Sequence, residues 1–312
     1  MRNIILGCLL FCTGDLFAQS VQQLLDKAFD LRTAEKYDDA IAVYDQVLRK
    51  DTINYEAYVY RGMSYYDKED KQKAYADYSK AINLQPDSAL AYHYRAILFF
   101  SALYTEESID DNTKAITLTT NDTIRMMSFS NRGNAKQQKR DFQGAYEDYS
   151  KAYILDTNSI GTLNNIATVL DELGRVDEGM RYLKKIIQKD SLFVGAYVNL
   201  GFQSNNLGKY KDALGYFDKA LSIQKDEPLS LNNRGLTKYY LKDFDGALKD
   251  INRSLSFYPG NAYAFKNRAL VYLAQNKKDL ACKDLQEALD NEFTKMYGNE
   301  VNDLKKKHCT GK

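Results

Sequence analysis

Small residues recur along the chain at a nearly constant interval, and helix-like apolar patterns surround them. A first series of glycine or alanine is spaced by 34 residues, with a single interval of 37. It comprises Ala28, Gly62, Ala96, Gly133, Ala167, Gly201, Gly235 and Ala269. A second small series lies twelve residues later in each unit and comprises Ala40, Ala74, Ser108, Ala145, Gly179, Ala213, Ala247 and Ala281. Eight units in one register predict an array of repeats rather than one globular core.

Large apolar residues flank both small series. They stand four positions before the first series, as Tyr58 does, and mostly four positions after the second, as Tyr78 does. Spacings of four and seven place these residues on one face of a helix. Each unit is therefore predicted to form a helix, a tight turn and an antiparallel second helix, whose small residues let the two helices approach closely.

A 34-residue helical hairpin with small residues at its positions 8 and 20 resembles the tetratricopeptide repeat (TPR). The closest match is the run Tyr60-Arg61-Gly62, Ala74-Tyr75-Ala76-Asp77-Tyr78-Ser79-Lys80-Ala81-Ile82 and Pro86. The resemblance covers residues 21–295 and implies an all-α, right-handed superhelical solenoid of about eight TPR helix pairs. The units lie near residues 21–54, 55–88, 89–122, 126–159, 160–193, 194–227, 228–261 and 262–295.

The two ends and one junction of this array depart from the repeat. Residues 296–312 are predicted to hold a capping helix, in which only Val301 and Leu304 are apolar over 299–308. A solenoid needs such a polar end because its last repeat has no neighbour to cover it. Three extra residues follow the third unit, near Asp122 to Arg125. We expect the stack to be loosest at that junction.

Position 7 of a unit is commonly leucine in this family, but five units carry arginine there. Sixteen residues after each arginine stands an aspartate, giving the pairs Arg61 and Asp77, Arg95 and Asp111, Arg132 and Asp148, Arg234 and Asp250, and Arg268 and Asp284. The units with Ile166 and Leu200 lack both partners. We predict structural ion pairs between the two helices of each hairpin, because the arginine fork can hold a carboxylate with two hydrogen bonds. The alternative is that these arginines bind an anionic ligand.

The first helices line the concave surface in superhelices of this family, and their position 6 points inward. Amides or tyrosines occupy that position in seven units: Tyr60, Tyr94, Asn131, Asn165, Asn199, Asn233 and Asn267; Asn134 adds a further amide. An amide both donates and accepts, so it can pair with a peptide backbone. The row resembles the asparagine ladder in the TPR region of O-GlcNAc transferases. The alternative is that asparagine is simply frequent at this position of the family.

The resemblance implies a non-enzymatic, protein- or peptide-binding TPR scaffold of the cell envelope. The alternative is an architectural subunit of an envelope or secretion complex that uses its convex face or edges. The carboxylate clamp of chaperone-binding TPRs is not expected, because Ser130, Gly195 and Asn199 replace its cations. No phosphate loop, nucleophile elbow or zinc spacing occurs, so we expect no cofactor and no metal. His93, at an inward position, is expected to touch ligand or solvent.

A net charge of +1 gives no general attraction for nucleic acid or an anionic membrane. Residues 1–18 have the layout of a signal peptide cleaved after Ala18, because Arg2 precedes an apolar run that is too short to span a bilayer. A retained anchor and a lipoprotein modified at Cys8 are the alternatives. Export predicts a periplasmic or extracellular protein.

Two cysteines, Cys282 and Cys309, remain after the signal segment. Exported TPR proteins with Ala-Cys-x-Asp in the last unit and a terminal cysteine look similar, which implies one disulfide between them. The alternatives are a buried Cys282 and a free, reactive Cys309 beside three lysines.

Overall fold

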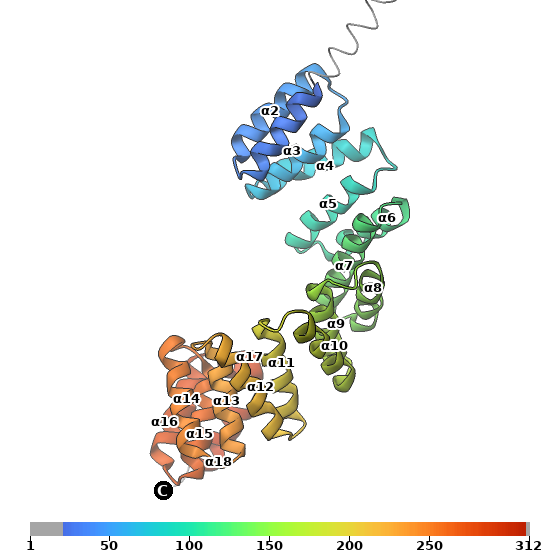
Figure 1. Cartoon of the computed structure of the whole chain (residues 1–312). Helices are drawn as coiled ribbons and strands as arrows, with labels where there is room; N and C mark the ends of the chain where they lie inside the picture. The colour runs from blue at the N-terminus through green and yellow to red at the C-terminus, as the bar shows by residue number, and fades with distance from the viewer. Residues whose placement is uncertain (1–20, 310–312) are drawn as a thin grey trace, which may run out of the picture. The chain divides into compact units, whose positions relative to one another are not determined.

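The computed structural model describes residues 21–309, and every regular element in that range is a helix. Residues 21–33 are helical, and the helices that follow are α2 (Tyr37–Lys50), α3 (Tyr55–Asp67), α4 (Lys71–Leu84), α5 (Ala89–Ser101), α6 (Thr105–Leu118), α7 (Asp122–Gln138), α8 (Phe142–Leu155), α9 (Ile160–Glu172), α10 (Val176–Lys189), α11 (Val194–Asn206), α12 (Tyr210–Ile223), α13 (Pro228–Tyr240), α14 (Phe244–Phe257), α15 (Ala262–Ala274), α16 (Lys278–Asp290), α17 (Phe293–Tyr297) and α18 (Glu300–Cys309). The predicted all-α repeat fold is confirmed (Figure 1). The predicted signal peptide, with Cys8 and Cys12, lies outside the described residues. Over 21–309, no helix is long and apolar enough to cross a membrane.

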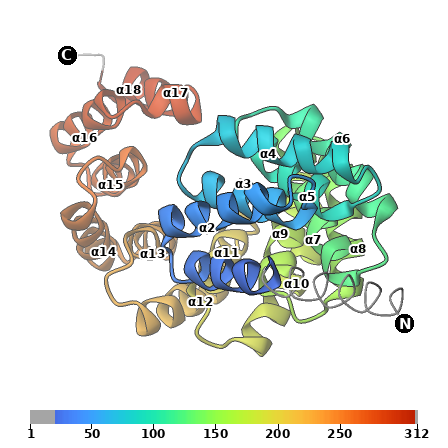
Figure 2. The same ribbon diagram turned by 90° about the horizontal axis from the view of Figure 1, so that it is seen from above.

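Consecutive helices pair as hairpins, for example α3 with α4, α5 with α6 and α13 with α14 (Figure 2). The first helices of neighbouring hairpins also touch: α3 meets α5, α5 meets α7, α11 meets α13, and α13 meets α15. Successive second helices of the same unit have no comparable contact among the described residues. The surface of the first helices is called the first-helix face below.

The chain divides into two compact units, residues 1–162 and 163–312.

The prediction that the stack is loosest near Asp122 to Arg125 is wrong, because the extra residues lengthen α7 to 17 residues and α7 packs directly on α6. Asn121 caps the lengthened helix by accepting hydrogen bonds from the backbone of Thr123 and Ile124.

The small residues of the first series lie where the two helices of a hairpin approach most closely. A Cβ atom at Gly62 would lie 2.7 Å from the Tyr78 ring, and one at Gly201 would lie 2.7 Å from the Phe217 ring. At the equivalent positions of α9 and α10 the residues are Ala167 and Leu183, and leucine is smaller than either aromatic residue. In the hairpins of Gly62 and Gly201, an aromatic ring on the second helix therefore leaves no room for a Cβ atom on the first.

One residue with positive φ forms the turn of each hairpin. The eight residues are Glu35, Glu69, Leu103, Arg140, Gly174, Gly208, Lys242 and Asn276, with φ between 58° and 70°. Only two of them are glycine, the residue for which this conformation carries no steric cost. In the other six hairpins the turn residue carries a side chain, so its positive φ costs free energy.

The C-terminal cap consists of two helices rather than the single one predicted. Phe293 of α17 is fully buried against α15 and α16, and Val301 of α18 is buried beside it. A disulfide joins Cys282 of α16 to Cys309 at the end of α18. The sequence pattern missed α17 because its one core residue, Phe293, lies outside the repeat register. Together these contacts cover the end of the last hairpin.

Candidate partner-binding site

The five arginines at position 7 donate hydrogen bonds within their own hairpins. Each donates from Nε and Nη2 to the aspartate sixteen residues later, with distances of 2.7–2.9 Å. The aspartates are Asp77, Asp111, Asp148, Asp250 and Asp284, and none is more than 6% exposed. These side chains connect the first and second helix of one hairpin.

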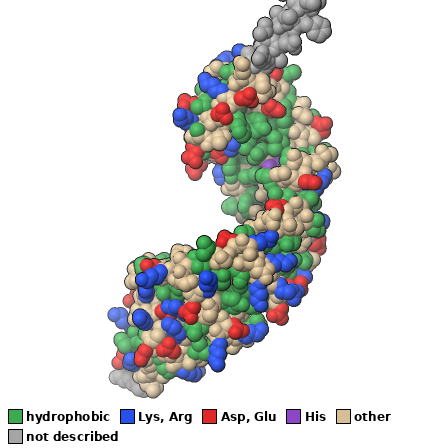
Figure 3. Space-filling model, in the orientation of Figure 1, with side chains coloured by type: hydrophobic (Ala, Val, Ile, Leu, Met, Phe, Trp, Pro, Cys, Tyr) green, Lys and Arg blue, Asp and Glu red, His purple; other side chains and the backbone are tan. Residues whose placement is uncertain are grey.

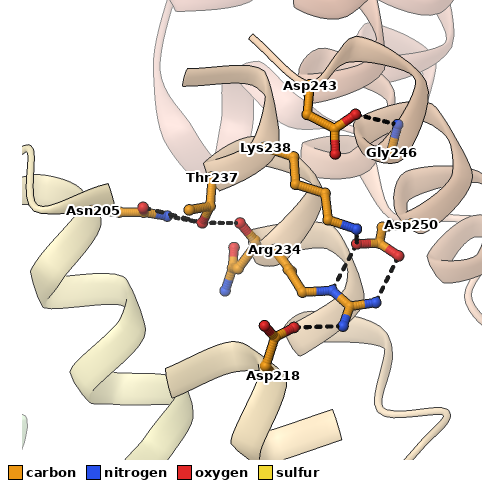
Figure 4. A network of polar contacts seen from close by, with 9 residues as sticks. Asn205, Asp218, Arg234, Thr237, Lys238, Asp243, Gly246 and Asp250 are labelled. Carbon is orange, nitrogen blue, oxygen red and sulfur yellow. Dashed lines mark hydrogen bonds and ion pairs between the residues drawn. The ribbon is translucent and has the colours of Figure 1, made fainter. Parts of the chain in front are cut away.

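The remaining nitrogen of each arginine reaches the preceding hairpin, a contact that the sequence analysis did not predict. Nη1 donates to Asp45, Ser79, Thr113, Asp218 or Asn252, at 2.5–3.3 Å. Figure 4 shows one example, in which Arg234 holds Asp250 of its own hairpin and Asp218 of the one before. All three nitrogens of these arginines are therefore occupied within the protein, which leaves the side chains poorly placed to bind an anionic ligand.

A second cation, a lysine, lies beside two of these aspartates and helps to lower their pKa. Burial raises the pKa of the Asp148 carboxyl, but hydrogen bonds from Arg132 and Lys136 outweigh it and hold the pKa below its usual range. An arginine and a lysine likewise hold the pKa of the Asp250 carboxyl below its usual range. Asp111 has only Arg95, and there burial keeps the pKa above its usual range. Without a lysine, the one arginine beside Asp111 does not offset the loss of water around this carboxyl.

Three of the predicted amides lie on the first-helix face of the second unit. Asn199 is exposed, while Asn165 and Asn233 are partly buried. They stand at equivalent positions of α9, α11 and α13, which are consecutive first helices. In the first unit Asn131 is likewise partly buried on α7, but the side chain of Asn134 accepts a hydrogen bond from the Tyr149 hydroxyl at 2.7 Å.

The prediction that Asn267 lies in a binding groove is wrong. Asn267 is completely buried, and its amide donates to the side chain of Asn232 at 3.0 Å. The neighbouring Lys266 is also buried and pairs with Glu300 of α18 at 3.2 Å. The capping helices thus enclose this end of the first-helix face, and the repeat register alone does not show their position.

Aromatic side chains dominate the first-helix face of the first unit. Tyr60 stacks on Tyr44 with ring centres 6.5 Å apart, and Tyr94 stacks on Tyr78 at 6.2 Å. Phe29, about half exposed, meets the edge of Tyr60. Hydrophobic side chains gather over α3 and α5 in Figure 3. The two predicted tyrosines therefore pack between hairpins with one side while their other side borders this apolar surface.

The expectation that His93 touches ligand or solvent is wrong. Its side chain is 1% exposed, and Nδ1 lies 2.9 Å from the hydroxyl of Ser128 on α7. Burial lowers the pKa of the imidazole to about 4. His93 is therefore a neutral residue of the contact between α5 and α7. No group of three or more His, Cys, Asp or Glu side chains with metal-binding geometry occurs over residues 21–309.

Two segments of the chain match a family of known repeats. Residues 25–89 and 232–292 match the model of the tetratricopeptide repeat. The chain contains tetratricopeptide repeats. The first matched segment lies in the first compact unit and the second in the other, so both units hold TPR sequence. This repeat is typical of proteins that bind other proteins, because its stacked hairpins present extended surfaces.

Solved structures agree with the TPR fold. The crystal structure of the APC/C hetero-tetramer Cut9–Hcn1 aligns with a TM-score of 0.59 at 20% identity, over 89% of this chain and 54% of that one. PilF of Pseudomonas aeruginosa aligns at 0.57 and 18% identity, over 67% and 94%. YrrB, a TPR protein with an unusual peptide-binding site, aligns at 0.51 and 21%, over 60% and 95%. The chain spans about half the length of the Cut9–Hcn1 chain, and these likenesses show the fold alone.

Proposed function

We propose that this TPR protein is a non-catalytic scaffold that binds an extended segment of a partner protein on its first-helix face. The row of Asn165, Asn199 and Asn233 on consecutive first helices of the second unit carries the proposal. Amides at the repeat spacing can pair with the backbone of an extended chain without depending on its side chains. The peptide-binding site named for YrrB belongs to a protein of the same fold and supports this use of it.

The amide row is tested by replacing all three residues. The Asn165→Ala, Asn199→Ala, Asn233→Ala variant should bind the tightest decapeptide from a random display library about 10- to 100-fold more weakly, because each lost backbone hydrogen bond contributes about 1 kcal/mol. Fluorescence anisotropy measures the affinity. Asn83→Ala, on the exposed side of a second helix, is the matched control and should bind normally.

Two outcomes would contradict the proposal. Unchanged peptide affinity in the triple variant, with circular dichroism showing an intact fold, would reject the amide row. Failure of any peptide to bind, together with capture of a folded partner that tolerates the triple variant, would favour an architectural subunit that uses its convex face or edges.

We also propose that the mature protein is exported, on the basis of the signal-like pattern of residues 1–18. A disulfide between Cys282 and Cys309 fits an oxidising compartment. Intact mass spectrometry of the protein from its native cells should give a mature chain that begins at Gln19 with both cysteines oxidised. A chain that keeps Met1 and in which Cys282 and Cys309 are both free thiols would contradict export.

A further inference from the structure

A cavity of about 180 Å³ lies in the second unit where α9, α10 and α11 meet. Apolar side chains of the lining include Val176, Met180 and Leu183 of α10 and Phe202 of α11, and polar groups include Asp171, Asn199 and Gln203 from the two first helices. Asn199 belongs to the amide row, so the cavity adjoins the surface on which a partner segment is proposed to bind. About 150 Å³ of apolar cavity is enough to hold benzene, so a leucine, isoleucine or methionine side chain would fit.

The cavity exists because this hairpin has smaller residues than its neighbours. At the position of Val176 the other hairpins of this region carry Phe142, Tyr210 and Phe244. Gly179, which also lines the cavity, is the single glycine of the second small series. Protein interiors are otherwise closely packed, so a space that the neighbouring hairpins fill with an aromatic ring is a specific feature of this one.

A polar group of the cavity is accessible to a partner. Gln203 lines the cavity and is only 7% exposed as a whole residue. Its amide is not among the buried side-chain atoms that lack a hydrogen bond over residues 21–309, so it reaches solvent, and the backbone of a partner can bond to it. The residues that line the cavity include one carboxylate, on the exposed Asp171, and no lysine or arginine. The charge of the site therefore favours a cation.

We propose that this cavity receives one aliphatic side chain of an extended partner segment that carries a lysine or arginine next to it. The aliphatic group packs on Val176, Met180 and Leu183, while the amides of Gln203 and Asn199 bond to the adjoining backbone. Asp171 pairs with the neighbouring basic side chain. The inference rests on the proposed function and adds to it the chemical class of the partner.

The first test compares peptides selected from a random decapeptide display library on the intact chain and on Val176→Phe. The variant fills the cavity with the residue that Phe142 and Phe244 place in neighbouring hairpins, so it should fold. Peptides selected on the intact chain should share an aliphatic residue beside lysine or arginine, and those selected on Val176→Phe should lose this pattern. Tyr210→Phe is the control; it keeps the ring that stacks on Tyr240 and should select the same peptides as the intact chain.

The second test changes the peptide instead of the protein, so it does not depend on the folding of a variant. Replacing the aliphatic residue of the best peptide by alanine should weaken binding to the intact chain about 10- to 100-fold. The same replacement should have almost no effect on binding to Val176→Phe. Asp171→Asn should remove the preference for lysine over glutamate at the neighbouring position.

The outcomes separate the two proposals. Selected peptides that need the amide row but tolerate alanine at every aliphatic position would overturn the cavity inference alone. Selected peptides that bind equally well to Val176→Phe would overturn it too. No selected peptide at all would overturn the proposed function and, with it, the inference that rests on it.

Discussion

Burial of a single titratable residue, His93, should make the stability of the protein depend on pH. The buried imidazole of His93 has one hydrogen-bond partner, Ser128, and its Nε2 has none among the described residues. Burial lowers the pKa of this histidine to about 4, against about 6.5 in an unfolded chain. The unfolded state therefore binds the proton first as the pH falls.

Acidification from pH 7 to 5 should cost the protein about 2 kcal/mol through His93, because stability is lost where only the unfolded state is protonated. His93→Asn keeps a polar group near Ser128 and cannot take up the proton, so its melting temperature should change little over this range. Thermal melts at the two pH values measure both. His308→Gln, at a partly exposed histidine, should keep the acid sensitivity of the natural chain.

Two exposed glycines offer a matched comparison of backbone conformation. Gly208 has φ of +70° in a hairpin turn, whereas Gly215 lies inside α12, and a Cβ would meet no atom within 4 Å at either. Gly208→Ala should destabilise by about 1 kcal/mol, since an L side chain disfavours positive φ. Gly215→Ala should stabilise by about 0.5–1 kcal/mol through helix propensity. Urea unfolding would contradict this account if both changes had the same sign.

In the hairpin of α11 and α12, Gly201 and the Phe217 ring lie in close contact. Gly201→Ala should destabilise by about 1–3 kcal/mol, because the new methyl would overlap the Phe217 ring. Combining it with Phe217→Leu reproduces the Ala167 and Leu183 combination of the previous hairpin, so part of the loss should be recovered. Thermal melts of the two single variants and the double variant form a mutant cycle. Strictly additive losses would show that the two positions do not face each other as described.

The ion pair that joins the two helices of one hairpin can be tested in the same way. Asp111→Ala leaves Arg95 partly buried without its carboxylate and should destabilise by about 1–3 kcal/mol. Arg95→Leu with Asp111→Tyr copies the residues Leu200 and Tyr216 of another hairpin and should cost less than Asp111→Ala alone. A larger loss in the double variant would argue that the ion pair itself, rather than the absence of an unpaired charge, stabilises the hairpin.

Features that follow the repeat period could be predicted from the sequence, and features that depend on contacts outside it could not. The hairpins follow from one apolar pattern repeated along the chain, and the arginine and aspartate positions follow from the same register. The links from Arg234 to Asp218 and its equivalents join different repeats through varied partners, so no single pattern marks them.

Burial at the candidate site depends on those same contacts between hairpins. Asn267 shares its repeat position with Asn199, yet Asn267 is completely buried beside Asn232 of the preceding hairpin and Asn199 is exposed. The cavity beside Asn199 was not predicted either, because it results from an absent ring at Val176 rather than from a residue with evident chemistry. The smaller side chain at that repeat position was the one signal in the sequence that could have shown it.

A partner segment that lies on the first-helix face of the second unit should shield the exposed residues of that face from solvent. Phe202 on α11 and Phe257 at the end of α14 are similarly exposed, at 46% and 50%, but only Phe202 lies on that face. Hydroxyl-radical footprinting of the intact chain, with and without the tightest selected decapeptide, measures both at once. Oxidation of Phe202 should fall several-fold in the complex while that of Phe257 stays unchanged. Protection of Phe257 without protection of Phe202 would contradict the account.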